Sequence, residues 1–333
     1  MSKGIISFLK IALSIGLAGL LLYLVFKNIE WDEFWAKAES VDYTWVFVSI
    51  GLSIVAYVAR AYRWNILLQP LGHDLKTSRT TLAVLIGYLA NLAIPRLGEI
   101  TRCGVLNRND NVPVATALGS VVTERIMDMT VLLILILFSL VSESSLLLSF
   151  LQTAYKDLEI PMYVPVILLI IGLIGIVSLI FFIKKQDKLK GKVAELLKGF
   201  VAGFLSLRNI SRPFGFVIST VILWVVYYLM SYIIIYSIPE TAHLDFSAGL
   251  MLLITGGIAI ALPVQSGFGT YHGMIAGMLL LYGIEKNTGI FLATLLHSSQ
   301  IVAVALFGTI AILISFLIRK KSEASNEESP SEG

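Results

Sequence analysis

The sequence predicts an all-α polytopic membrane protein with about six transmembrane helices and two re-entrant helical hairpins in an inverted-topology repeat. Hydrophobic residues make up 57% of the 333 positions and charged residues only 14%. Long apolar runs recur along the chain, and two further apolar segments are interrupted by proline and glycine. This composition is typical of membrane proteins, and we expect no separate soluble enzyme domain.

Six apolar runs approach the length of about 20 residues that a helix needs to cross the hydrocarbon core. The first follows Lys3 and Lys10 and lacks the cleavage pattern of a signal peptide, so we interpret it as a retained helix. The six predicted spans are residues 5–26, 45–59, 116–140, 162–183, 214–238 and 290–318.

The charges of the loops predict the orientation. Lys and Arg gather before the first span, in the stretches 60–79 and 184–212, and directly after residue 318, whereas the alternate loops are rich in Asp and Glu. By the positive-inside rule, both termini are cytoplasmic, and we expect the chain in the cytoplasmic (inner) membrane.

The first interrupted segment, residues 80–107, is divided at Pro95. As helices its two arms, 80–94 and 96–107, are about 22 Å and about 18 Å long, which is less than the hydrocarbon core of about 30 Å. The loop charges require the segment to begin and end on the cytoplasmic side. A re-entrant hairpin with its tip near Pro95 satisfies both conditions. The alternative is two full transmembrane spans, which also return the chain to the cytoplasmic side.

Residues 246–283 repeat this arrangement but begin and end on the outside, with a break that contains Pro263, Gly267 and Gly269. One hairpin enters the membrane from the inside and the other from the outside, so the two halves form an inverted-topology repeat. This arrangement is associated with secondary transporters whose broken helices meet near the midplane. The alternative is that proline and glycine merely kink ordinary spans. The predicted regions are 1–43 (first helix and an external interfacial helix), 44–183 (first half), 184–212 (cytoplasmic basic amphipathic linker), 213–318 (second half) and 319–333 (disordered cytoplasmic tail).

Charged residues in apolar surroundings are the strongest functional signal. Three are spaced by i+3 in the second arm of the first hairpin, and three more lie on the predicted span that follows. Buried charges cost about 2.5–3.5 kcal/mol each even on the lenient insertion scale, so they must be compensated. They either form an ion-pair network that locks hairpin to span, or border a cavity in which guanidinium groups bind a lipid phosphate. These residues are Arg96, Glu99, Arg102, Glu124, Arg125 and Asp128.

The second break offers weaker candidates. His272 is titratable near neutral pH, although a single histidine there is more simply a hydrogen-bonding residue at a helix end. Gly267 and Gly269 allow the backbone to approach a ligand, but close helix packing explains them equally well.

These motifs resemble the flippase-like family named after the lysylphosphatidylglycerol synthase transmembrane region. Its signature N-x-x-x-P-x-R-x-G-E-x-x-R is similar to the stretch from Asn91 to Arg102. In this chain Pro95 directly precedes Arg96, without the intervening residue of the signature, and Gly98 lies two residues after Arg96. The resemblance extends to E-R-x-x-D, which begins at Glu124, and to the second break, although many relatives have glutamate where this chain has His272. It implies lipid translocation between leaflets. We count Asn91, which matches the signature, and His272, which departs from the family's glutamate, with the charged residues as substrate-binding candidates.

We therefore expect a lipid translocase that moves a phosphate-bearing headgroup and performs no bond chemistry. The expected partners are anionic or zwitterionic phospholipids or a polyprenyl-phosphate lipid, with no nucleic acid, cofactor or metal. The alternatives are an intramembrane lipid-modifying transferase or hydrolase that uses Glu99, Glu124 or His272 as general base, and a non-catalytic envelope scaffold. Since no metal-ligand cluster, nucleophile motif or phosphate loop is evident, the enzyme alternative ranks second.

Overall fold

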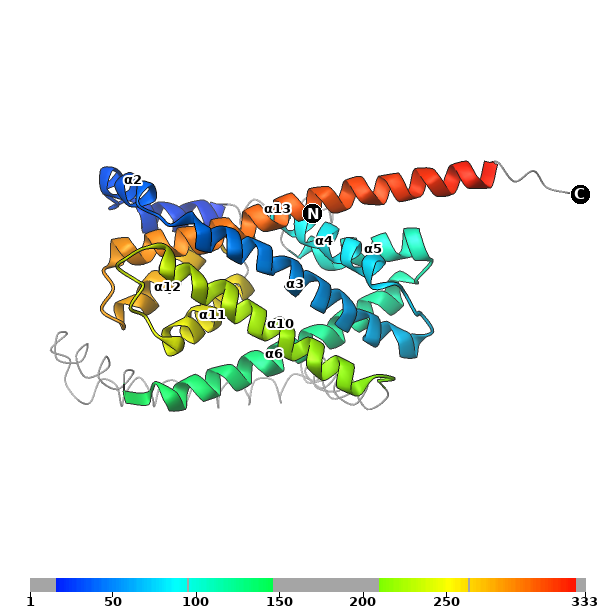
Figure 1. The fold of residues 1–333 in the computed structure, drawn as a ribbon, viewed down its shortest axis with the longest axis horizontal. Coiled ribbons are helices and arrows are strands. Elements are labelled where there is room, and N and C mark those ends of the chain that lie inside the picture. The colour runs from blue at the N-terminus through cyan, green and yellow to red at the C-terminus, as the bar shows by residue number, and fades with distance from the viewer. Residues whose placement is uncertain (1–15, 95, 146–209, 263, 328–333) are drawn as a thin grey trace, which may run out of the picture. The chain divides into compact units, whose positions relative to one another are not determined.

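The computed structural model describes residues 16–94, 96–145, 210–262 and 264–327, and every regular element in these ranges is helical (Figure 1). The predicted all-α fold class is confirmed for this part of the chain. Two compact units are formed, by residues 1–124 with 210–333 and by residues 125–209. The predicted span 162–183 and the linker up to residue 209 lie outside the described residues.

The order of helices follows the predicted repeat of span, hairpin and span. After a short helix, Gly16–Phe26, the first half contains α2 (Trp31–Glu39), α3 (Tyr43–Leu68), η1 (Gln69–Leu71), α4 (Thr77–Ala93), α5 (Leu97–Asp110) and α6 (Val114–Ser142). The second half contains α10 (Pro213–Tyr232), η3 (Ile233–Ser237), α11 (Phe246–Ala261), η4 (Gln265–Gly267), α12 (Thr270–Leu280) and α13 (Lys286–Glu327).

Within the described residues, four helical stretches are long and apolar enough to cross a membrane, and they agree with four of the six predicted spans. The described part of the first predicted span forms the shorter apolar helix Gly16–Phe26. The four long stretches are Tyr43–Leu71, Val114–Ser142, Pro213–Ser237 and Lys286–Ile318.

Two predicted boundaries are wrong. The second span was expected to end at residue 59, with Arg60 and Arg63 in a cytoplasmic loop, but α3 continues to Leu68 and buries both arginines. The chain was also expected to become disordered after residue 318, but α13 continues to Glu327. Its last residues contain neither glycine nor proline, so nothing in the sequence interrupts the helix there.

Each hairpin has a hydrophobic core of its own, and the two cores lie at opposite ends of α3. Hairpin α4–α5 packs with the C-terminal half of α3 and the start of α6, through buried side chains that include Trp64, Leu68, Val84, Cys103 and Leu106. Hairpin α11–α12 packs with the N-terminal end of α3 and with α13, through side chains that include Val46, Leu252, Ile275, Leu279 and Leu292. Figure 1 shows this separation along α3.

Helices α3 and α10 lie side by side within the first unit (Figure 1). The hydroxyl of Ser49 on α3 donates a hydrogen bond to the carbonyl oxygen of Met230 on α10, at 3.0 Å. Outside the apolar helices, Lys37 on α2 pairs with Glu240 at 2.7 Å, and this hydrogen bond keeps the pKa of Glu240 below its ordinary value. Helix α2 is therefore held to the chain that leads into the second hairpin.

Candidate functional site

A buried carboxylate, Glu124 on α6, receives three arginine side chains. One oxygen lies 2.5 Å from Nε of Arg60 and 3.3 Å from Nη2 of Arg63, both on α3, and the other lies 2.8 Å from Nη2 of Arg102 on α5. The four side chains are at most 5% exposed. These four residues, called the arginine cluster below, tie α3 and α5 to one carboxylate on α6.

The arginine cluster lies well inside its helices. Arg60 is eight residues before the end of α3, or about 12 Å along the axis, and Glu124 is ten residues after the start of α6, or about 15 Å. Ionisable groups at such depth in apolar helices are costly, and they usually mark a transport path or binding site.

Aromatic side chains hold two of the guanidinium groups in place. Nη1 of Arg60 donates hydrogen bonds to the hydroxyl oxygens of Tyr88 on α4, at 2.6 Å, and Tyr227 on α10, at 3.2 Å. The guanidinium of Arg102 lies over the ring of Trp64, 4.5 Å from its centroid, in cation–π geometry. The positive groups are therefore oriented before any ligand binds.

The predicted residues of the first hairpin do not all share one face. Arg102 joins the arginine cluster, and Glu99 is half-buried in the first turn of α5. Arg96 precedes the helix with a φ of 62°, is exposed, and has no ion-pair partner among the described residues. Arg96 thus lies at the tip of the hairpin and outside the buried cluster.

Arg125 and Asp128 follow Glu124 on α6, in the unit formed by residues 125–209. Helical spacing places Asp128 one turn beyond Glu124, on the same side of α6. The structure thus assigns Glu124, but neither of these two residues, to the unit that contains the arginine cluster.

Asn91 and Gly98 have structural roles inside the first hairpin. The backbone N–H of Gly98 donates to Oδ1 of Asn91 at 2.6 Å, which satisfies one of the free donors at the start of α5. A Cβ on Gly98 would collide with the carbonyl oxygen of Gly87, so the two arms touch through glycine. Pro95 and Pro263, the two predicted breaks, lie outside the described residues.

The second break is built on glycines in backbone conformations that other residues rarely adopt. Gly267 has a φ of 72° and Gly269 a φ of 79°, and the backbone carbonyl carbon of Leu21 would lie 2.7 Å from a Cβ on Gly269. Beside this break, the ring of His272 on α12 lies 5.2 Å from the ring of His297 on α13. The glycines here serve backbone geometry and helix packing.

The two breaks meet through Gln265, which the sequence did not single out. Its side-chain Nε2 donates to the carbonyl oxygens of Leu92, at 2.9 Å, and Ala93, at 3.2 Å, at the end of α4. Carbonyl groups in the last turn of a helix lack intrahelical donors. The second break supplies such a donor to the end of α4, the first arm of the first hairpin.

Similarity to known proteins agrees with this architecture. The sequence model of the lysylphosphatidylglycerol synthase TM region family matches residues 8–308. The chain belongs to this family. A UPF0104 membrane protein of Methanocaldococcus jannaschii is 26% identical over 165 residues, which cover 49% of this chain and 46% of the relative. No solved structure matches.

Membership of the lysylphosphatidylglycerol synthase TM region family confirms the resemblance found in the sequence. Together with the four long apolar helices, it identifies a multi-pass membrane protein. The alignment spans less than half of the length of the archaeal relative.

Sequence reasoning missed Arg60 and Arg63 in this family member, because it read positive residues as markers of a cytoplasmic loop. A signal was present: with Trp64 they continue the i, i+3, i+4 spacing of α3, and an apolar stretch, residues 66–68, follows them. Tyr88 and Tyr227 carried no comparable signal, because their contacts with Arg60 depend on the packing of α4 and α10 against α3.

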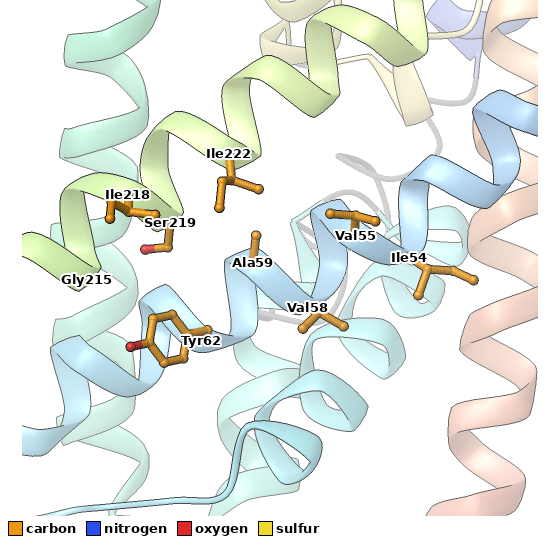
Figure 2. Close-up of a pocket in the computed structure, with 9 residues that line it drawn as sticks. All are labelled: Ile54, Val55, Val58, Ala59, Tyr62, Gly215, Ile218, Ser219 and Ile222. Carbon is orange, nitrogen blue, oxygen red and sulfur yellow. The ribbon is translucent and has the colours of Figure 1, made fainter.

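An apolar groove of about 540 Å³ lies between α3 and α10. Figure 2 shows aliphatic side chains around it, together with the hydroxyl groups of Tyr62 and Ser219. It is lined by no charged residue, so it does not suit a phosphate, and the arginine cluster is the better candidate for a polar headgroup. Among the described residues, no group of three or more His, Cys, Asp or Glu could hold a metal ion.

Proposed function

We propose that this chain is a lipid translocase that moves a phosphate-bearing headgroup between the leaflets while the acyl chains stay in the lipid. The convergence of Arg60, Arg63 and Arg102 on Glu124 carries this proposal. Guanidinium groups bind phosphate through planar, bidentate, charge-assisted hydrogen bonds. An entering phosphate would replace the carboxylate as their partner, and Glu124 would hold them in place when the site is empty.

The proposed route follows the inverted repeat. Helices α4, α5, α11 and α12 have 17, 14, 16 and 11 residues, so each is shorter than the hydrocarbon core of about 30 Å. The two hairpins pack at opposite ends of α3 and touch through Gln265. These observations support re-entrant hairpins that enter from opposite sides and meet near the midplane. The positive charges of the loops support the part of the proposal that places both termini in the cytoplasm.

The proposed cargo is an anionic or zwitterionic phospholipid or a polyprenyl-phosphate lipid, because all of these present a phosphate to the arginines. In the described conformation the arginine cluster is buried, so the headgroup reaches it only when the surrounding helices separate. Transport of this kind makes and breaks no covalent bond, and the proposed activity is therefore not enzymatic.

A reconstituted assay tests the proposal. Purified protein in liposomes should move fluorescent phosphatidylglycerol between leaflets, and Arg102→Ala should slow the movement about tenfold to a hundredfold, as expected from the loss of a charged hydrogen bond worth about 1.5–3 kcal/mol. Arg108→Ala, at an exposed position on the same helix, is the matched control and should leave the rate unchanged.

Three results would contradict the proposal: no lipid movement by folded protein across anionic, zwitterionic and polyprenyl-phosphate lipids, an unchanged rate in Arg102→Ala, or equal losses in Arg102→Ala and Arg108→Ala. Mass spectrometry of the recovered lipids separates the alternatives. Chemical conversion of a lipid would favour the transferase or hydrolase, whereas neither movement nor conversion would favour the scaffold.

A further inference from the structure

The second half contains a buried histidine pair that the proposed phosphate site does not use. His272 on α12 and His297 on α13 are each 4% exposed, and their ring centroids are 5.2 Å apart. Nε2 of His297 lies 3.0 Å from the carbonyl oxygen of Ser266 in the second break. Nδ1 of each ring is buried and has no hydrogen-bond partner among the described residues.

The histidine pair lies in the second half at a place similar to that of Arg102 and Glu124 in the first, although His272 is the third residue of α12 and Arg102 the sixth of α5. Each pair joins the second arm of a hairpin to the helix that follows it. Glu124 is the eleventh residue of α6, and His297 is the twelfth of α13. In the proposed inverted repeat, both pairs lie where the second arm of a hairpin meets the helix after it, so the two imidazoles are the polar group of the second half at that junction.

Aromatic rings surround the histidine pair. The ring of His297 stacks on Tyr271 at 4.9 Å and lies 5.1 Å from Phe268, and the ring of His272 lies 5.5 Å from Phe26. A cation within about 6 Å of an aromatic ring is attracted to the negative face of that ring. The attraction to these rings would therefore offset part of the cost of burying an imidazolium here.

Within the described residues, the helices around the histidine pair contribute little charge. The elements packed around it are Gly16–Phe26, α11, η4, α12 and α13, and Tyr271 is the one further titratable side chain that touches either ring within the described residues. Helices α11 and α12 and the turn η4 carry no Asp, Glu, Lys or Arg. Any change of charge at this place must come from the imidazoles.

We propose that His272 and His297 form a proton-binding site that gains one proton when the second break opens to water and loses it when the break closes again. The proton adds to a ring-nitrogen lone pair, and a second proton is opposed because two positive rings would lie in contact. On the proposed translocase, this site couples the crossing of an anionic headgroup to the proton gradient.

Proton binding is tested directly, without any lipid assay. In protein labelled with 15N-histidine and reconstituted in nanodiscs, the resonances of both rings should shift together in one transition as the pH is lowered from about 8 to about 4. His272→Gln should alter the transition of His297, whereas His243→Gln, at an exposed position, should not. Two rings that stay neutral throughout, or that titrate independently of each other, would overturn the proposal.

Coupling is tested in proteoliposomes with and without an imposed pH gradient. The gradient should change the rate of lipid movement about fivefold or more, the range expected for a coupling of 1–3 kcal/mol, and His272→Gln should abolish this response. If the rate of lipid movement did not respond to the gradient, the proposed proton coupling would be wrong, but the proposed translocase activity would stand. If the two histidines titrated together but no lipid moved, the proton-binding site would stand and the translocase proposal would be wrong. The two proposals can therefore fail separately.

Discussion

Glu124 is the residue on which the arginine cluster depends, because three guanidinium groups share its two oxygens. In Glu124→Gln, a neutral amide replaces the carboxylate and leaves the buried arginines without this counter-charge. We expect a loss of about 3–5 kcal/mol in the free energy of unfolding, the range measured when one partner of a buried ion pair is removed.

The unfolding midpoint of the purified protein in detergent measures this loss. Glu39→Gln removes an exposed carboxylate from α2 and should leave the midpoint unchanged. If Glu124→Gln were as stable as the parent protein, the carboxylate would not hold the cluster, and our account of the empty site would be wrong.

At the scale of residues, the cost of buried charge predicted an ion-pair network between the first hairpin and the span that follows it, and the structure pairs Arg102 with Glu124. It did not predict Arg60 and Arg63, because an arginine near the end of an apolar run looks the same whether it faces water or a buried carboxylate. It also placed Arg96 on the helix, whereas α5 begins one residue later. Single positions of this kind depend on tertiary contacts between separate helices.

The first hairpin, as an element, depends on the contact between its arms at Gly98. A Cβ there would collide with the carbonyl oxygen of Gly87 and lie 2.7 Å from the side chain of Asn91. Gly98→Ala should therefore force the arms apart and lower stability by about 1–3 kcal/mol, as overpacking does elsewhere.

Gly104→Ala provides a matched control on the same helix, because a Cβ at Gly104 would meet nothing within 4 Å. This substitution should be neutral, or stabilising by up to about 1 kcal/mol through helix propensity. The two unfolding midpoints are compared in one detergent. Equal midpoints would show that the arms do not rely on the glycine contact.

Elements were more predictable than residues. The two hairpins followed from arms too short to span and from the breaks at Pro95 and Pro263, and the structure has helix pairs in both places. The sequence did not predict the ends of α3 and α13, because the arginines at 60 and 63 and the polar residues after 318 resemble loop residues. Pattern alone does not distinguish a charged stretch inside a helix from one beyond it.

On the scale of the whole molecule, the two hairpins carry different chemistry where their second arms meet the helix that follows. The first half has arginines on a carboxylate, and the second has two histidines among aromatic rings. Gln265, in the second half, is hydrogen-bonded to the end of α4 in the first. If lipid passes between the hairpins, this contact must break and form again in every cycle.

A cross-link between the two breaks tests that requirement. Cys103 is the only cysteine in the sequence, so Cys103→Ala provides a cysteine-free background for Leu92→Cys combined with Gln265→Cys. A short bis-maleimide should join the two positions and reduce lipid movement in liposomes to the protein-free background. Each single-cysteine variant, treated with the same reagent, should keep its untreated rate, which separates the effect of the link from that of the label. Full lipid movement by the cross-linked protein would mean that the breaks stay together during transport, and that the headgroup crosses by a path that leaves this contact closed.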